Sequence, residues 1–123
     1  MKAELTNAGH GTTLQVRLSG SAGGTETVKG FAVGGSLGLF VHHPITDEDK
    51  PQAWRDQWVI SHIRSGMSLG CWFDKRTQAM NAAREIIAVY DVAVEPRELL
   101  EQFRNRGEKP SVAEIAEKHG MRL

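Results

Sequence analysis

The chain has 123 residues, of which 40% are hydrophobic and 24% charged, and its 15 basic residues balance its 15 acidic ones. This length and composition suit one modest globular domain and argue against global disorder. The zero net charge argues against a protein that holds DNA or an anionic membrane by bulk positive charge, but it permits a local cationic patch. The sequence contains no long apolar run, no apolar leader at Met1 and one cysteine, so we expect a soluble, cytoplasmic protein without membrane contact.

The first 73 residues are expected to form strands and turns, because glycine is frequent there and apolar residues alternate with polar ones. Gly30 and Gly38 lie inside strands and predict bulges or close backbone approach. A flexible turn is expected over 19–25, and an acidic loop over 46–51 leads into a short helical turn over 51–56. The predicted strands cover residues 14–18, 27–33, 37–43, 58–63 and 67–73.

Helices are predicted for the remainder of the chain. The first covers residues 75–90, with Asp74 as its N-cap and an apolar stripe at helical spacing. The second covers 96–107, and the third covers 111–120, where a serine and a glutamate have the spacing of a capping box. The side chains expected to be buried in the hairpin and helices are Met67, Leu69, Cys71, Phe73, Ala79, Ala83, Ile86, Tyr90, Leu99, Leu100, Phe103, Val112, Ile115 and Ala116.

These elements predict the α+β class, because the strands come first and the helices last. We expect an antiparallel sheet of four to five strands, packed on one face by the long helix, with two further C-terminal helices. Residues 1–123 are expected to form a single domain that is mainly β over 1–73 and mainly α over 74–123.

Histidines and the cysteine are the candidates for metal or catalytic chemistry. His42 and His43 adjoin on one predicted strand and His62 lies on another, so one of the pair could share a face with His62. No second cysteine or nearby carboxylate completes a metal site. Cys71 and His62 could form a thiol–imidazole pair across the hairpin, but Cys71 is expected to be buried as a small apolar side chain. Phosphate-binding and dinucleotide glycine motifs are missing, so we expect no metal, no cofactor and no catalytic residue.

Positive charge is concentrated between Arg55 and Arg84, where five cations and two carboxylates give a net charge of plus three. The three tryptophans of the chain lie in or beside this segment. Interleaved basic and aromatic residues are one footprint of nucleic-acid binding, although core tryptophans and solvated arginines produce the same pattern. The predicted binding residues are Arg64, Lys75, Arg76, Arg84, Arg55 and Trp54.

Residues 58–86 resemble a pattern in small, mostly uncharacterised proteins of phages and integrated mobile elements. In that pattern a Thr/Ser-His strand, a glycine turn and a Leu-Gly strand precede an alanine-rich helix. The resemblance covers about a quarter of the chain and implies a prokaryotic accessory protein.

Residues 69–74, followed by Ala79, Ala82 and Ala83, also resemble the sheet-to-helix joint of two DNA-binding domains. These are the plant ethylene-response-factor domain and the arm-binding domain of tyrosine integrases, which lay a three-stranded sheet on DNA through basic residues. This sequence departs from them at several positions where their strands carry arginine, namely Ser61, His62, Ser68 and Gly70. The resemblance therefore implies the fold more than the DNA contact.

Together these features predict a non-catalytic binding module, an accessory protein of a prokaryotic mobile element that docks on nucleic acid or on a nucleic-acid-handling protein. The first alternative is a protein–protein adaptor or inhibitor without nucleic-acid contact, because tryptophans and edge strands suit protein interfaces. The second is a small enzyme. The sequence leaves the choice of partner open, and a homodimer remains an alternative.

Overall fold

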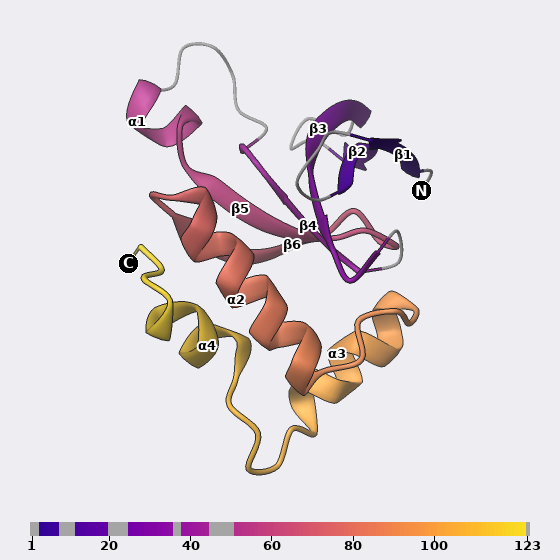
Figure 1. Ribbon diagram of the computed structural model, residues 1–123. Coiled ribbons are helices and arrows are strands. Elements are labelled where there is room, and N and C mark those ends of the chain that lie inside the picture. The colour runs from indigo at the N-terminus through magenta and orange to yellow at the C-terminus, as the bar shows by residue number, and fades with distance from the viewer. Residues whose placement is uncertain (1–2, 8–11, 20–24, 36–37, 45–50, 123) are drawn as a thin grey trace.

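The computed structural model describes residues 3–7, 12–19, 25–35, 38–44 and 51–122 (Figure 1). Within them, six antiparallel strands form one sheet in which each strand pairs with the next in the chain. The strands are β1 (Ala3–Asn7), β2 (Thr12–Ser19), β3 (Thr25–Val33), β4 (Leu39–His42), β5 (Trp58–His62) and β6 (Ser68–Phe73). The helices are α1 (Gln52–Arg55), α2 (Arg76–Val89), α3 (Pro96–Arg104) and α4 (Val112–Lys118).

The predicted α+β class and antiparallel sheet are confirmed, and so is the short helical turn at α1. The sheet exceeds the predicted four to five strands, because β1 pairs with β2 along its whole length. The sequence of β1 contains alanine, glutamate and asparagine, which are depleted in strands. Pairing with β2 outweighs that local preference. The turn predicted at 19–25 and the acidic loop predicted at 46–51 lie almost wholly outside the described residues.

Helix α2 covers one face of the sheet and contacts strands β3 to β6 (Figure 1). Its inner side consists of three alanines and Ile86, all completely buried. These small side chains allow a close approach between helix and sheet, where the strands supply Val41, Ile60 and Phe73 to the same core. The apolar stripe predicted for the long helix therefore packs against the sheet as expected.

Asp74 is not the N-cap of α2. Lys75 occupies that position, and its backbone N–H donates to the side-chain oxygen of Gln78 at 3.1 Å. The Asp74 carboxylate instead accepts a hydrogen bond from Arg122 at 2.9 Å. The prediction was wrong because a partner from the other end of the chain competes for this carboxylate.

The second face of the sheet is also buried at β4 and β5. Phe40 and Val59 lie on it, because neighbouring strand residues point to opposite faces, and both are buried. Gly30 of the neighbouring strand β3 leaves room for Phe40, because a Cβ at position 30 would come within 2.7 Å of the Phe40 ring. Gly38 has no room for a Cβ either, because the Val33 carbonyl blocks that space. The close backbone approach predicted at both glycines is confirmed.

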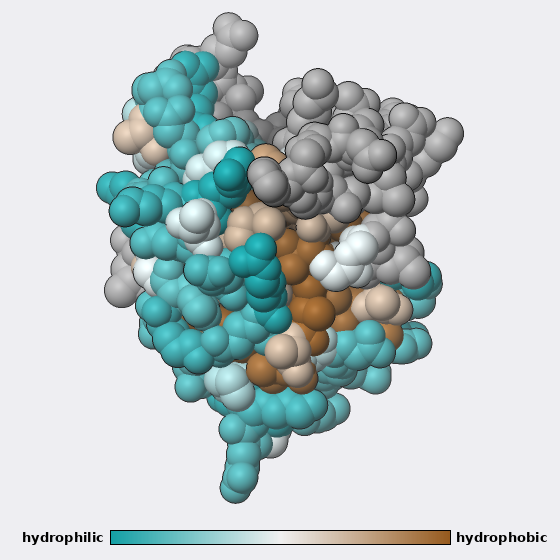
Figure 2. Space-filling model, in the orientation of Figure 1, coloured by the Kyte–Doolittle hydropathy of each residue, from teal (hydrophilic) through white to brown (hydrophobic). Residues whose placement is uncertain are grey.

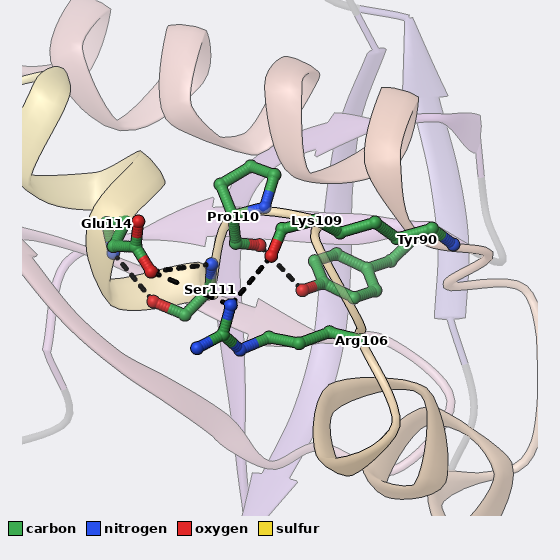
Figure 3. A network of polar contacts seen from close by, with 6 residues as sticks. All are labelled: Tyr90, Arg106, Lys109, Pro110, Ser111 and Glu114. Carbon is green, nitrogen blue, oxygen red and sulfur yellow. Dashed lines mark hydrogen bonds and ion pairs between the residues drawn. The ribbon is translucent and has the colours of Figure 1, made fainter.

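Polar contacts tie the C-terminal end of α2 to the segment between α3 and α4 (Figure 3). The Tyr90 hydroxyl donates to the Pro110 carbonyl at 2.6 Å, and Arg106 donates to the Lys109 carbonyl at 2.7 Å. The predicted capping box at the start of α4 is confirmed: the Glu114 N–H donates to the Ser111 hydroxyl at 3.1 Å, and the Ser111 N–H donates to the Glu114 carboxylate at 3.3 Å. Helix α4 is thus held at its N-terminus by its own local sequence.

Glu85 of α2 holds the other end of α4. Its carboxylate lies 2.7 Å from the Lys118 ammonium and 2.9 Å from Nε2 of His119. These two partners lower the pKa of Glu85 by hydrogen bonding, Lys118 having the larger effect. The apolar side of α4 packs into the main core through Ile115 and Ala116, as predicted.

Some residues predicted to be buried are not. Met67 is 50% exposed because it precedes β6, and Leu100 is 49% exposed because it lies on the outer side of α3. Gly70 has a φ of +75°, and the pairing of β6 with β5 shifts register in this part of the sheet, while Leu69, Cys71 and Phe73 still face the core. Both C-terminal helices also end before the predicted glycines, α3 at Arg104 and α4 at Lys118.

The surface is mixed in character. On the face shown in Figure 2, apolar residues gather in one central area, and hydrophilic residues border it on the left and below. None of the helices in the described part of the chain has the length and apolarity that crossing a bilayer requires.

Candidate functional site

The histidines of β4 and β5 are separated by the sheet. His42 lies opposite Val59 and His62 lies opposite Leu39, which places the two imidazoles on different faces. Nε2 of His42 lies 2.7 Å from the Ser61 hydroxyl, and its Nδ1 lies 2.6 Å from the His43 carbonyl. Because a carbonyl only accepts, Nδ1 carries the proton and Nε2 accepts from Ser61. Burial lowers the pKa of His42, although the bond to the His43 carbonyl opposes this effect.

His62 and Cys71 are not paired with each other. Nε2 of His62 donates to the Val92 carbonyl at 2.8 Å, and its Nδ1 accepts from the Ser65 hydroxyl at 2.9 Å. Cys71 contacts the Leu69 carbonyl through Sγ at 3.6 Å, and burial raises the pKa of its thiol to about 11. A thiol with this pKa stays protonated at neutral pH. Among the described residues, no three histidine, cysteine or acidic side chains are placed to share a metal ion.

The cations among the predicted binding residues lie in different parts of the molecule. Strand β5 spans about 13 Å from Trp58 to His62, and Arg64 lies beyond its far end. There it forms an ion pair with Glu95, next to the start of α3. Arg84 lies about 12 Å along α2 from Arg76 and donates to Asn81 at 3.0 Å. Arg64 and Arg84 therefore lie apart from the start of β5 and the start of α2, where the other predicted binding residues are found.

Trp54 and Trp72 are brought together, while Trp58 lies elsewhere. The ring centroids of Trp54 and Trp72 are 6.1 Å apart, with an angle of 63° between the ring planes. Trp58 is on the helix-covered side of the sheet, 3.8 Å from the His43 ring and 6.2 Å from the Phe31 ring. The antiparallel pairing of β5 with β6 explains the contact between Trp54 and Trp72. Helix α1 leads into the start of β5, which lies beside the end of β6.

A cavity of about 250 Å³ lies beside the tryptophan pair, and its described lining residues are Trp54, Gln57, Trp72 and Arg122. Local hydrogen bonds hold Gln57 in this lining: its N–H donates to the Trp54 carbonyl at 3.2 Å, and its carbonyl accepts from Nδ1 of His43 at 2.9 Å. The backbone of Gln57 is thus fixed between α1 and the end of β4.

Arg122 reaches the cavity because the chain turns back after α4. Gly120 makes this turn with a φ of +96°, and the Arg122 N–H donates to the Trp72 carbonyl at 2.7 Å, along the edge of β6. The Arg122 guanidinium remains exposed and bonds the Asp74 carboxylate at 2.9 Å. Sequence analysis missed Arg122 and Gln57, since no local pattern connects them to the tryptophans.

We call this region the tryptophan-end surface and define it by the cavity residues and by the two cations within three residues of Trp54 or Trp72 in the sequence. Arg55 belongs to α1, and its Nε is buried without a hydrogen-bond partner among the described atoms. Lys75 is exposed where β6 leads into α2, and the adjacent Arg76 lies 4.5 Å from the centre of the Phe31 ring. The tryptophan-end surface comprises Trp54, Arg55, Gln57, Trp72, Lys75 and Arg122.

Comparison with known proteins gives no relative: no protein-family model, no curated protein and no solved structure matches this chain. The resemblance of residues 58–86 to proteins of mobile elements remains a prediction.

Proposed function

We propose that this protein is a non-catalytic module that docks on nucleic acid through the tryptophan-end surface. The observation that carries the proposal is the contact between Trp54 and Trp72 beside a cavity that Arg122 also lines. Aromatic rings provide stacking platforms for bases, and neighbouring cations attract the phosphate backbone. This combination distinguishes the tryptophan-end surface from the isolated Arg64 and Arg84.

The charge balance supports a small contact with the nucleic acid rather than a strand wrapped around the protein. The tryptophan-end surface has three cations, Arg55, Lys75 and Arg122, while Asp56 and Asp74 lie beside them in the sequence. Few phosphate contacts are expected from such a surface, so affinity should be modest and its salt dependence shallow. A protein of zero net charge that binds nucleic acid in this way needs contacts to bases to supplement the phosphate contacts.

We also propose that the protein serves a prokaryotic mobile element, which the resemblance of residues 58–86 supports. Genes beside its coding sequence test this part. Integrase or capsid genes there would agree with it, whereas a conserved metabolic operon would contradict it.

Titration with labelled single-stranded DNA and RNA tests the docking function. We expect binding at about 50 mM salt that weakens at about 200 mM, because released counterions oppose the complex at higher salt. Trp54→Ala should weaken binding about tenfold through lost stacking. Trp54 is half exposed, so this variant is expected to fold normally.

A charge-matched pair provides the control. Arg122→Ala and Arg104→Ala each remove one exposed arginine, but Arg104 belongs to α3 at the far end of the molecule (Figure 1). Only Arg122→Ala should reduce affinity. If both variants bind like the wild type, the tryptophan-end surface is not the docking site, and an absence of binding at low salt would reject nucleic acid altogether.

A protein partner is the second candidate function, favoured by a different cavity. This cavity measures about 210 Å³ and has the half-exposed Met67 and Leu100 in its wall. Exposed apolar side chains around a hollow are typical of protein interfaces. An adaptor would retain its partner at high salt and after nuclease treatment, and Leu100→Lys would release the partner. Loss of the partner on nuclease treatment would instead favour the first function.

A further inference from the structure

We infer that the outer edge of β6 binds an extended, acidic peptide segment of a partner protein, which adds a strand to the sheet and places one apolar side chain in the cavity beside Leu100. This inference rests on the second candidate function, a protein partner, and specifies the chemistry of that partner. It does not depend on nucleic-acid docking. Three features support it: the open main chain of β6, the apolar cavity at the start of this strand and the charge of α3.

The outer edge of β6 has open main-chain groups at its start. Strand β6 is last in the sheet order, so β5 pairs with only one of its two sides. The Met67 carbonyl accepts from the His62 N–H at 2.8 Å. Because successive main-chain groups of a strand point to opposite sides, those of Ser68 point away from β5. Ser68 and Gly70 are both exposed, so this part of the edge is open to a partner.

The other end of the same edge already pairs with main chain. The Arg122 N–H donates to the Trp72 carbonyl at 2.7 Å, and within the described chain this is the only main-chain hydrogen bond on the outer side of β6. The edge therefore accepts a chain that runs beside it, and Ser68 is left for a second one. A row of main-chain donors and acceptors selects an extended peptide, because that conformation presents the matching row.

The cavity beside Leu100 lies at the start of β6. Its volume is about 210 Å³, and Ser68 and Leu69 line it together with Leu100 and Phe103 of α3. Met67 and Leu100 are half exposed in its wall. A peptide that pairs with Ser68 therefore passes the cavity, and one of its side chains can enter. An aliphatic side chain is favoured there, because the contact removes apolar surface of both partners from water.

The arginines of α3 select acidic residues in the same peptide. Arg97 and Arg104 flank Leu100, because helix residues three and four positions apart share one side. Both arginines are exposed, and neither takes part in an ion pair between described residues. The carboxylates of this helix, Glu98 and Glu101, lie farther round it from Leu100. Carboxylates on either side of the apolar peptide residue would complement the two guanidinium groups.

A synthetic peptide tests the inference. The labelled probe has about seven residues, with a central leucine, a threonine on each side of it and a glutamate two positions away in both directions. Fluorescence anisotropy measures its affinity for the full chain. Replacing the central leucine with alanine should weaken binding about tenfold, because less apolar surface is buried. Replacing both glutamates with lysine should also weaken binding, most strongly at about 50 mM salt.

N-methylation of the peptide tests strand addition itself. Alternate N–H groups of an extended peptide point to the same side, so two methylated probes are made, one for each alternating set. Methylation of the set that pairs with β6 should weaken binding at least about tenfold, and methylation of the other set should have a much smaller effect. Equal effects of the two sets would overturn strand addition.

Matched variants locate the site. Leu100→Ala and Trp54→Ala each remove a half-exposed apolar side chain, from α3 and from α1 respectively. Leu100→Ala should weaken binding of the leucine peptide at least about fivefold with an unchanged urea midpoint, while Trp54→Ala should not alter it. The double variant Arg97→Ala/Arg104→Ala should weaken binding of the glutamate probe and leave binding of a glutamine version unchanged. Wild-type affinity of Leu100→Ala would overturn the assigned site.

The remaining outcomes separate this inference from the proposed function. No binding of the leucine peptide up to about 1 mM would overturn the inference, while nucleic-acid docking would stand on its own titration. Loss of nucleic-acid binding with intact peptide binding would reject the docking function alone. Displacement of the peptide by an oligonucleotide would show that both ligands use one surface, which would overturn the separate peptide site.

Discussion

At the scale of single residues, His42 and His43 show how one step along a strand changes the environment of a side chain. His42 is 3% exposed and has both ring nitrogens occupied, by Ser61 and by the His43 carbonyl. His43 is exposed and contacts Trp58. Both residues hold the fold together, and His43 also supports the backbone of Gln57 in the cavity wall.

The buried His42 makes stability depend on pH on the acidic side. Because its folded-state pKa lies below 6.5, the unfolded chain binds a proton that the folded protein excludes. Stability is therefore expected to fall as pH decreases below about 6.5. Urea unfolding at several pH values measures this loss. His42→Gln should reduce the loss, whereas His43→Gln should retain it, and an undiminished loss in His42→Gln would contradict the assignment.

At the scale of elements, the turn after α4 determines whether Arg122 reaches the cavity. Gly120 has a φ of +96°, and a Cβ there would come within 2.6 Å of the Gln78 side chain. Gly107 also has a positive φ, +61°, but a Cβ there would meet nothing within 4 Å. The two glycines thus share an unusual backbone conformation and differ in their surroundings.

Alanine substitution at these glycines separates the two effects. Gly107→Ala should cost roughly 1 kcal/mol of stability through backbone strain alone. Gly120→Ala should cost more because the Gln78 contact adds to the strain, and it should also weaken nucleic-acid binding by displacing Arg122. Chemical denaturation and the titration described above measure the two quantities. Equal costs for both variants would show that the Gln78 side chain moves aside freely.

At the scale of the whole molecule, one continuous core joins the sheet to the helices. It includes Val33 and Ile60 from the strands, Ala82 from α2, Leu99 from α3 and Ile115 from α4. The charged contacts of Glu85 and the polar network around Tyr90 connect the same helices at the surface. No helix in the described range stands apart from this core except the short α1, which has no buried residue.

We predict that the chain unfolds as one domain. Far-ultraviolet circular dichroism reports all helices and strands, while tryptophan fluorescence reports the region around α1, β5 and β6. Because both regions depend on one core, the two signals should give the same urea midpoint. An earlier fluorescence transition would show that the tryptophan-end surface opens separately and would contradict the single-domain prediction.

The sequence by itself determined the features that depend on neighbouring residues. The α+β class, the hairpin before α2, the apolar stripe of α2 and the capping box of Ser111 and Glu114 follow from periodicity and capping. The same local signals failed at Met67 and Leu100, which are apolar but half exposed. They also singled out Arg64 and Trp54 together as binding residues, although Arg64 follows the far end of β5 from Trp54.

Only the tertiary structure decided which residues form the tryptophan-end surface. Pairing of β5 with β6 brings Trp54 to Trp72, and the return of the chain after α4 adds Arg122, far away in the sequence. The same packing draws Asp74 to Arg122, so Asp74 does not cap α2 as its neighbours in the sequence predict, and it draws Arg64 to Glu95. Contacts across such separations depend on strand register and on the packing of complete elements, and neither is encoded in a short stretch of sequence.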